Sequence, residues 1–181
     1  SFCRDFMTYP VCAPEEMRTL DKRTMESESI TSYRLMNRAA DRLMDTVLKQ
    51  GLIEEEARVL VLSGPGNNGG DAALLGLRLF KAGHKVHLLL VGEEEKNGAE
   101  NAKAVREAGA SLNHSRVASR DELEKLPPLI GGADIIIDGL FGIGLSRNVS
   151  GIFHEVIEAV NLSGLPVISL DIPSGVNGHN G

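Results

Sequence analysis

The segment from Arg58 to Asp71, RVLVLSGPGNNGGD, constrains the fold more than any other part of this chain. Val59 to Leu62 form a short apolar run, and a turn-forming Ser-Gly-Pro-Gly sequence follows it directly. Such a run is typical of a strand that is buried on both faces of a parallel sheet. From Asp71 apolar residues recur at helical spacing as far as Gly83, which predicts a helix that ends at this glycine.

The connection between this strand and this helix has the composition of a ligand site. It contains glycines that permit backbone angles forbidden to other residues, namely Gly64, Gly66, Gly69 and Gly70. A glycine loop before a helix directs free N–H groups and the positive end of the helix dipole to one point, which suits an anion. Asn67, Asn68 and Asp71 add side-chain oxygens that suit a cation or sugar hydroxyls. A plain strand–helix turn is the simpler alternative, but it needs fewer glycines and polar residues.

Two common nucleotide-binding loops fit this segment less well. Gly64 to Gly69 formally match G-x-G-x-x-G, but a dinucleotide dehydrogenase also needs an acidic residue at the end of the next strand. The next predicted strand, Lys85 to Val91, ends in apolar residues, and the first acid beyond it is Glu93. A Walker loop is excluded because no Lys-Ser or Lys-Thr pair follows the glycines.

Predicted strands and helices alternate along the whole chain. We expect strands at residues 59–62, 85–91, 111–117, 134–138 and 166–170. We expect helices at residues 14–27, 31–50, 71–83, 97–108 and 151–160, with a short helix that Ser119 caps and that ends near Pro127. This alternation predicts a mostly parallel sheet with helices on both faces. The chain begins with Ser1 and stops at Gly181 in a turn-rich stretch, so we expect a single domain over residues 1–181 that is trimmed at its C-terminal end.

Length and composition exclude several classes of protein. A chain of 181 residues suits one domain with a substantial core. The net charge of −6 and the lack of a basic stripe argue against nucleic-acid binding. The apolar runs are only as long as strands, so we expect no membrane partner. Cys3 and Cys12 are the only cysteines and form neither a disulfide framework nor a metal set, which is typical of a reducing, cytoplasmic location.

Polar residues follow three of the predicted strands, and ligands bind at the carboxyl ends of strands in open parallel sheets. Asn67–Asp71 follow the first of these strands, Asp138 and Gly142–Asn148 follow the second, and Asp171 and Ser174 follow the third. Carboxylates at one edge repel one another unless protons or a cation intervene. Asn, Asp and Ser oxygens suit a hard cation, whereas the lack of a His or Cys in the cluster argues against zinc or copper. Alternatively, Asp138 is a strand-end cap and Asp171 forms an Asx-turn before proline.

Three motifs in order give the chain a resemblance to a known family. They are GPGNNGGD at Gly64–Asp71, DGLFGIG at Asp138–Gly144 and DIPSG at Asp171–Gly175. The sequence from about Pro14 to Gly181 resembles the YjeF N-terminal domain family, whose enzymes are NAD(P)H-hydrate epimerases. The resemblance implies a Rossmann-like three-layer α/β/α sandwich and a bound potassium ion. It also implies that the substrate is hydrated NADH or NADPH, whose R and S forms at nicotinamide C6 are interconverted.

The resemblance also implies roles for individual residues. Asn68, Asp138 and Ser174 match the potassium ligands of the family. The positions that match its substrate contacts are Asn67, Asn68, Gly69, Gly70, Asp71, Gly142, Ile143, Gly144, Leu145, Ser146, Arg147, Asn148 and Asp171. Our hypothesis is that Asp171 is the catalytic general acid and base, which moves a proton as the C6 hydroxyl is lost and regained from the other face.

The sequence departs from the family pattern at two places. The family's L-M-E-N-A-G is LMNRAA here, at Leu35–Ala40, and the usual glycine after the loop aspartate is Ala72. Many bacterial members continue into an ADP- or ATP-dependent dehydratase, which this sequence neither shows nor excludes, and a homodimer is equally open. Two other functions stay open as alternatives. One is a non-catalytic dimerisation or binding module, as in the mRNA-decapping scaffold family, and the other is a nicotinamide dehydrogenase.

Overall fold

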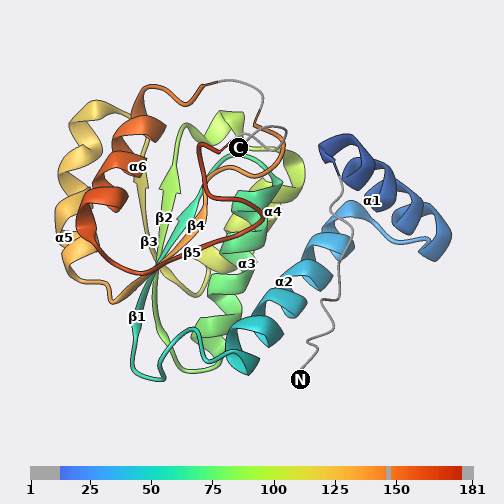
Figure 1. Cartoon of the computed structure of the whole chain (residues 1–181), viewed down its shortest axis with the longest axis horizontal. Coiled ribbons are helices and arrows are strands. Elements are labelled where there is room, and N and C mark those ends of the chain that lie inside the picture. The colour runs from blue at the N-terminus through green and yellow to red at the C-terminus, as the bar shows by residue number, and fades with distance from the viewer. Residues whose placement is uncertain (1–12, 146–147, 177–181) are drawn as a thin grey trace, which may run out of the picture.

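The computed structural model of this protein describes residues 13–145 and 148–176, and its centre is a five-stranded sheet in the order β3-β2-β1-β4-β5 (Figure 1). The strands are β1 (Arg58–Ser63), β2 (Lys85–Val91), β3 (Asn113–Val117), β4 (Ile135–Gly139) and β5 (Val167–Ser169). Every pairing between neighbours is parallel. The predicted parallel sheet is therefore confirmed, and β1 lies at its centre as its continuous apolar run requires.

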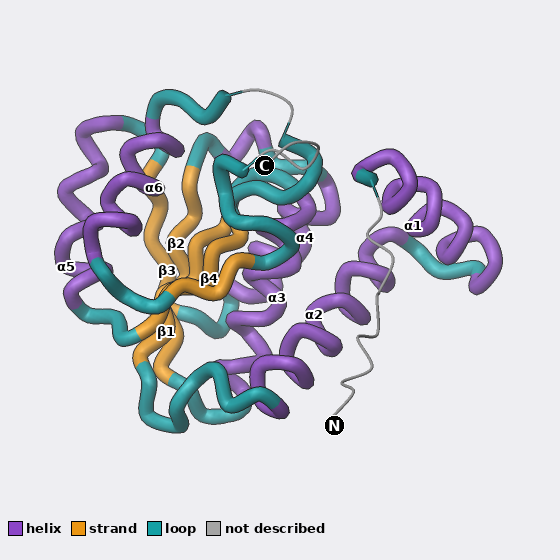
Figure 2. Tube along the Cα trace, viewed as in Figure 1, coloured by secondary structure: helices purple, strands orange, loops and turns teal. Residues whose placement is uncertain are grey.

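Helices cover both faces of the sheet, as the tube view in Figure 2 shows. They are α1 (Pro14–Glu28), α2 (Ser32–Lys49), α3 (Asn67–Lys81), α4 (Ala99–Gly109), α5 (Leu126–Gly131) and α6 (Ile152–Ser163), with short 3₁₀ turns at Glu94–Lys96 and Arg120–Lys125. One core cluster includes Val61, Leu75 and Leu88 on the α2–α3 side, and another includes Leu60, Leu89 and Val156 on the α6 side. The chain thus forms the three-layer α/β/α sandwich expected from its sequence.

Most helix ends lie within about three residues of the predicted boundaries, and the contacts explain the differences at α3 and α5. Helix α3 begins at Asn67 rather than Asp71, because the N–H groups of Gly69 and Gly70 already donate to the carbonyl of Gly66. Residues 67–70 are therefore the first turn of a helix, and the loop itself is only residues 64–66. Helix α5 continues through Pro127 and Pro128, where we expected the helix to end, because proline lacks only an N–H that the first turn leaves unpaired.

Helix α2 begins as its sequence predicts. The hydroxyl oxygen of Thr31 accepts a hydrogen bond from the N–H of Arg34 at 3.2 Å, which satisfies one free donor of the first turn. Met36, Ala40 and Val47 are buried on one face of this helix, and Met36 and Ala40 pack with Leu74 of α3 and Ala104 of α4. None of the helices within residues 13–145 and 148–176 combines the length and the apolar character needed to cross a membrane.

Candidate functional site

The loop after β1 is built from close backbone contacts that only glycine allows. A Cβ atom on Gly64 would lie 2.0 Å from the carbonyl oxygen of Leu140, and one on Gly69 would lie 2.0 Å from the carbonyl oxygen of Gly64. Both distances are far below van der Waals contact. The glycines of this motif therefore let the loop, the first turn of α3 and the chain after β4 touch one another.

A residue that sequence analysis missed holds this loop in place. The side-chain amide of Asn101, on α4, donates to the carbonyl oxygens of Gly64 at 2.9 Å and of Gly66 at 2.8 Å. Asn101 is fully buried. The only signal in the sequence is a polar residue at a helical position among alanines, which by itself does not distinguish a structural amide from a surface residue.

Asn68 connects the ends of three strands. It lies in the first turn of α3, after β1, and its amide nitrogen donates to the carbonyl oxygens of Phe141 at 2.8 Å and of Leu170 at 3.2 Å. Phe141 follows β4 and Leu170 follows β5. The three predicted motifs therefore meet at this side chain, at the carboxyl edge of the sheet, where ligands bind in open α/β folds.

Asp138 is buried at the end of β4, with its carboxylate satisfied by four donors from nearby residues. Its oxygens accept from the hydroxyl of Ser174 at 2.6 Å, the N–H of Ser174 at 2.9 Å, the N–H of Leu140 at 3.1 Å and the hydroxyl of Ser169 at 3.2 Å. Asp138 also aligns with Leu62 in the sheet, so its side chain lies on the α6 side. This aspartate therefore ties the chain after β4 to the chain after β5.

The residues expected to hold a cation gather around Phe141. Ser174 accepts a hydrogen bond from the N–H of Phe141 at 2.9 Å and donates to Asp138, whereas Asn68 contacts the Phe141 carbonyl. In the described part of the chain, Asn68 makes no direct hydrogen bond to Asp138 or Ser174. Two carbonyl oxygens converge on the Asn68 amide, and the nearby side chains offer oxygens, which is the donor set that a hard cation takes. Among the described residues, no group of three or more His, Cys, Asp and Glu side chains could hold a metal ion.

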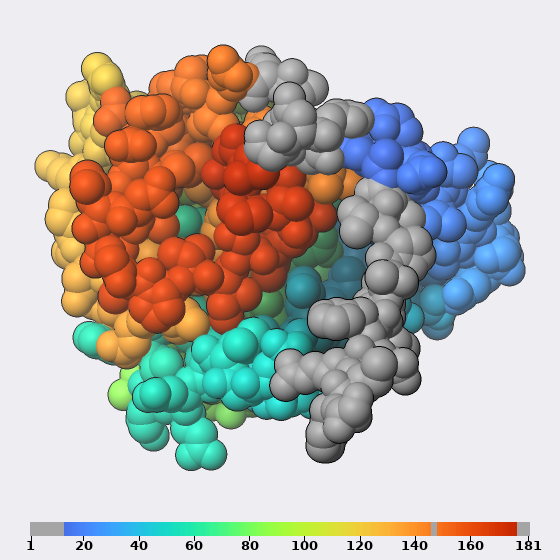
Figure 3. All heavy atoms as spheres, viewed as in Figure 1, coloured from blue at the N-terminus to red at the C-terminus, as the bar shows by residue number. Residues whose placement is uncertain are grey.

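A cavity on the other side of this edge contains the remaining polar residues. Asn68, Asp71 and Asp171 line a cavity of about 290 Å³ together with Arg42 from α2. A second cavity of about 640 Å³ between α1 and α2 shares Arg42 and Asp71 with it and includes Asn67. Figure 3 shows a recess between the red C-terminal segment and α2. The two cavities together form what we call the rim pocket.

Asp171 is held in an uncommon backbone conformation at the rim pocket. Its φ of 69° lies in the left-handed region, which few residues other than glycine adopt and which often marks functional sites. Its carboxylate accepts a hydrogen bond from the N–H of Ile143 at 2.8 Å. A Cβ on Gly142 would lie 2.4 Å from the same carboxylate, so a side chain at this position would displace the carboxylate from its place.

Three carboxyl groups interact at the rim pocket, but they differ from the set we expected. Burial first, and then the negative charges of Asp171 and Asp21, raise the pKa of Asp71 to about 7. The pKa of Asp21, on α1, is also raised, first by burial and then by Asp171. We expected Asp138 rather than Asp21 in this cluster. The difference arises because Asp138 points to the α6 side, whereas α1 brings Asp21 across from the far side of the rim pocket.

The other predicted substrate contacts occupy different environments. Gly69 and Gly70 are buried beneath the loop, and Ile143 and Leu145 are half-buried. A Cβ on Gly144 would lie 3.9 Å from the guanidinium of Arg18, so α1 approaches this loop. Asn148 is exposed, and Ser146 and Arg147 lie outside the described residues.

The departures from the family pattern on α2 have structural partners here. The guanidinium of Arg78 donates to the backbone oxygen of Asn37 at 3.1 Å and to its side-chain oxygen at 3.2 Å. Arg38 forms an ion pair with Glu28 of α1. The methyl group of Ala72 is buried against Gly139, where a Cβ would lie 2.3 Å from it. These residues therefore hold α1, α2 and α3 together at the side of the rim pocket.

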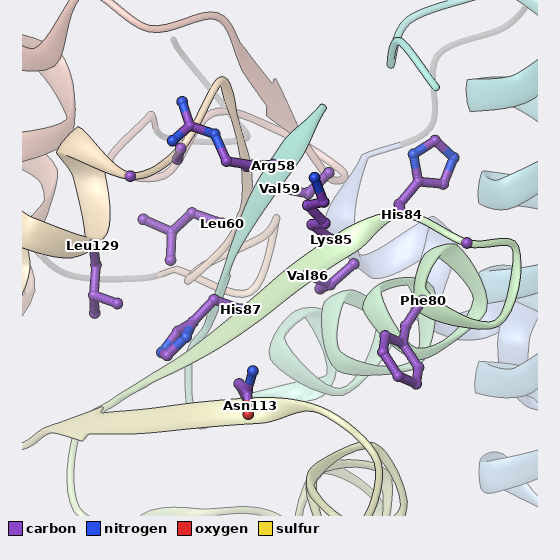
Figure 4. A pocket seen from close by; sticks show the side chains of 13 residues that line it. Arg58, Val59, Leu60, Phe80, His84, Lys85, Val86, His87, Asn113 and Leu129 are labelled. Carbon is purple, nitrogen blue, oxygen red and sulfur yellow. The ribbon is translucent and has the colours of Figure 1, made fainter. Parts of the chain in front are cut away.

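A separate cavity of about 490 Å³ lies at the amino ends of β1 and β2 (Figure 4). Two of its polar side chains are paired within the protein, since Arg58 binds Asp134 at 2.7 Å and His87 contacts Ser115 at 3.0 Å, whereas the Nδ1 atom of His84 is buried without a partner among the described residues. None of the predicted site residues lines it. We therefore assign the chemistry to the rim pocket at the opposite edge.

Comparison with known proteins agrees with this architecture. An NAD(P)H-hydrate epimerase from Limosilactobacillus fermentum is 33% identical over 180 residues, which cover 97% of this chain and 79% of that protein. A bifunctional NAD(P)H-hydrate repair enzyme Nnr from Thermofilum pendens is 35% identical over 94% of this chain, which spans only 32% of that protein's length. The crystal structure of yeast YNL200c shares the fold, with a TM-score of 0.77 at 22% identity over 92% of this chain and 72% of that one.

The family model that matches this chain is described as the YjeF-related protein N-terminus, and it matches residues 32–181. This range includes α2, all five strands and the three motifs that meet at Asn68. The chain therefore belongs to the family of YjeF-related protein N-terminal domains.

Proposed function

We propose that this chain is an NAD(P)H-hydrate epimerase domain, which interconverts the R and S forms of hydrated NADH and NADPH. Relatives at 33% to 35% identity that match nearly all of this chain carry this name or that of the bifunctional repair enzyme. The single observation that carries the proposal is that Asn68, Asp71 and Asp171 line one cavity at the carboxyl edge of the sheet. A dehydrogenase is disfavoured because β2 ends in Leu90 and Val91 without an acidic residue.

The reaction requires a proton at the C6 oxygen of the reduced ring and a second proton transfer on the opposite face. When the hydroxyl leaves as water, the lone pair of ring nitrogen N1 forms a double bond to C6. A water that adds to the other face gives the other epimer and loses a proton. Asp171 is the group we assign to this proton transfer, because its carboxylate is fixed by the Ile143 N–H and lines the cavity. Such general acid–base catalysis typically contributes about 10²–10⁴-fold.

We further propose that Asn68, Asp138 and Ser174 hold a potassium ion. Two carbonyl oxygens converge on the Asn68 amide, and this concentration of oxygens supports the assignment. An amide group can also turn its own oxygen toward a cation. When bound, the ion supplies positive charge that stabilises these oxygens and anionic parts of the substrate. A potassium-dependent rise in melting temperature, absent with a bulky organic cation, tests this site without an activity assay.

The epimerase activity is tested with both hydrate epimers and a dehydratase that accepts only the S form. The dehydratase alone consumes the S epimer and leaves the R epimer. Adding this protein should convert the stranded R epimer, and repeating the assay without potassium measures the contribution of the ion. If the R epimer stays unconverted at stoichiometric amounts of folded protein, the proposed function is wrong.

Its partner in the cell is proposed to be an ADP- or ATP-dependent dehydratase, either fused to this domain or separate. The bifunctional relative from Thermofilum pendens supports the fused form by its name and greater length. The low number of cysteines supports a cytoplasmic location. Sedimentation of the purified protein determines whether it forms a homodimer.

A further inference from the structure

We propose that Asp71 is a second catalytic carboxyl group, which donates the proton to the leaving C6 hydroxyl while Asp171 accepts the proton from the incoming water. This inference rests on the proposed epimerase function and divides its proton transfers between two residues. The resemblance to the family marks Asp71 only as a substrate contact, and the structure supplies the reasons for a chemical role.

The first reason is the position of Asp71. Its side chain lines both cavities of the rim pocket, at the place where they join. Among the described residues, its Oδ1 atom is buried and has no hydrogen-bond partner. An unpaired buried oxygen costs free energy, so such an atom in a natural site points to a ligand that completes it. Asp171 lines the same cavity, which places two carboxyl groups on one bound substrate.

The second reason is the charge around Asp71. The charged groups that line the rim pocket are Arg18, Asp21 and Glu28 from α1, Arg38 and Arg42 from α2, and Asp171 after β5. Arg38 is already paired with Glu28. The dipole of α3 favours a negative charge only in its first turn, and Asp71 lies beyond that turn. Burial and the two nearby aspartates therefore prevail and favour the protonated carboxyl, with a pKa of about 7.

The third reason is the contrast between the two carboxyl groups. The carboxylate of Asp171 accepts a hydrogen bond from the N–H of Ile143, which stabilises its charged form. The Oδ1 atom of Asp71 has no such donor among the described residues. Two carboxyl groups in unlike environments divide the roles of acid and base. The protonated Asp71 is suited to donate, and Asp171 is suited to accept.

The proposed step balances. Asp71 gives its proton to the C6 hydroxyl, the C6–O bond breaks to release water, and the N1 lone pair forms the N1–C6 double bond. Water then attacks C6 from the other face, the electron pair returns to N1, and the proton from this water passes to Asp171. Proton exchange through water in the cavity returns the proton from Asp171 to Asp71. The reverse epimerisation uses the same two groups with their roles exchanged.

The test compares three variants in the coupled epimerase assay, with binding of the hydrate measured separately. Asp71→Asn keeps the shape of the side chain but cannot donate from a carboxyl. Asp45→Asn is the control on the exposed face of α2, where Asp45 pairs with Lys49. We expect Asp71→Asn to lower kcat by about 10²–10⁴-fold with little change in hydrate binding. Wild-type kcat should decline above about pH 7 as Asp71 loses its proton, and this decline should be absent from the residual activity of Asp71→Asn.

A third variant tests the role without changing Asp71 itself. Asp21→Asn removes one of the charges that raise the pKa of Asp71, so the alkaline decline of kcat should move to lower pH. If Asp71→Asn does not fold, the pH profile of Asp21→Asn tests the role of Asp71 by itself.

The results distinguish a failure of the proposed epimerase function from a failure of the role assigned to Asp71. An inactive wild-type protein contradicts the proposed function. An active wild type with an active Asp71→Asn overturns the role of Asp71 alone. The same conclusion follows if the residual activity of Asp71→Asn keeps the wild-type alkaline decline, or if Asp21→Asn leaves that decline in place.

Discussion

Asp138 and Asp71 lie at the same edge of the sheet, but the hydrogen-bonding environments of their carboxyl groups are opposite. On the α6 side, Asp138 accepts hydrogen bonds from two hydroxyls and two N–H groups. On the α2 side, the Oδ1 atom of Asp71 is buried without a partner among the described residues. A satisfied carboxylate stabilises the fold, whereas an unsatisfied one costs stability and is retained for chemistry. The comparison separates the structural half of this edge from the reactive half.

The largest effect, a loss of kcat, should come from a substitution at Asp171 in the reactive half of the edge. Asp171→Asn keeps the size of the side chain but removes its ability to accept a proton. We expect the folded variant to bind the hydrate and to lose about 10²–10⁴-fold in kcat, measured with the coupled dehydratase assay. Asp45→Asn serves as the matched control. Turnover at the wild-type rate would remove Asp171 from the catalytic role.

On the structural half, Asp138→Ala should mainly destabilise the fold. The substitution leaves the Ser174 hydroxyl and the N–H groups of Leu140 and Ser174 without their acceptor. We expect a loss of free energy of unfolding on the order of 2–4 kcal/mol, measured by urea denaturation. Asp45→Ala, which removes an exposed carboxylate, should cost far less. Equal losses in the two variants would show that Asp138 is no more important to the fold than an exposed carboxylate.

Asp71→Asn should have the opposite effect on stability, and this effect should grow as the pH rises from about 4 to about 7. The pKa of Asp71 is raised from 3.8 to about 7 in the folded protein, so the folded state holds a proton that the unfolded chain has released. Stability therefore falls as the pH rises between these two values. The variant escapes this loss and should be more stable than the wild type at about pH 8, by on the order of 2–4 kcal/mol, but not at about pH 4. A pH-independent difference between the two proteins would show that Asp71 is not a buried, protonated group.

The smallest effect is expected at the amino edge of the sheet. The Arg58 guanidinium and N–H hold the pKa of Asp134 well below its usual range. Because this pKa is lowered on folding, the stabilisation is present at neutral pH and is lost as the pH falls through the folded-state value. Both side chains are about half exposed, so Asp134→Asn should lower the melting temperature only slightly at pH 7. A large decrease would mean that this edge contributes more than its surface ion pair implies.

Much of this organisation could be predicted from local patterns. The apolar run at Val59–Leu62, the turn residues after it and the alternation of strands and helices sufficed for the parallel sheet, and β2 has the predicted bounds. The strand-end motifs could be placed at one edge because parallel strands share a direction. These inferences work because hydrophobic periodicity and glycine act within a few residues.

The remaining features depend on contacts between distant segments. The register of Asp138 with Leu62 decides which face of the sheet the aspartate occupies. Asn101 can hold the loop after β1 only because α4 packs beside that loop. Asp21 reaches the rim pocket only because α1 folds back over it. Local patterns determined the order of elements and the edge where polar residues gather. The tertiary structure alone decided which carboxyl group is satisfied and which is left unpaired, because burial and hydrogen-bond partners come from residues far away in the chain.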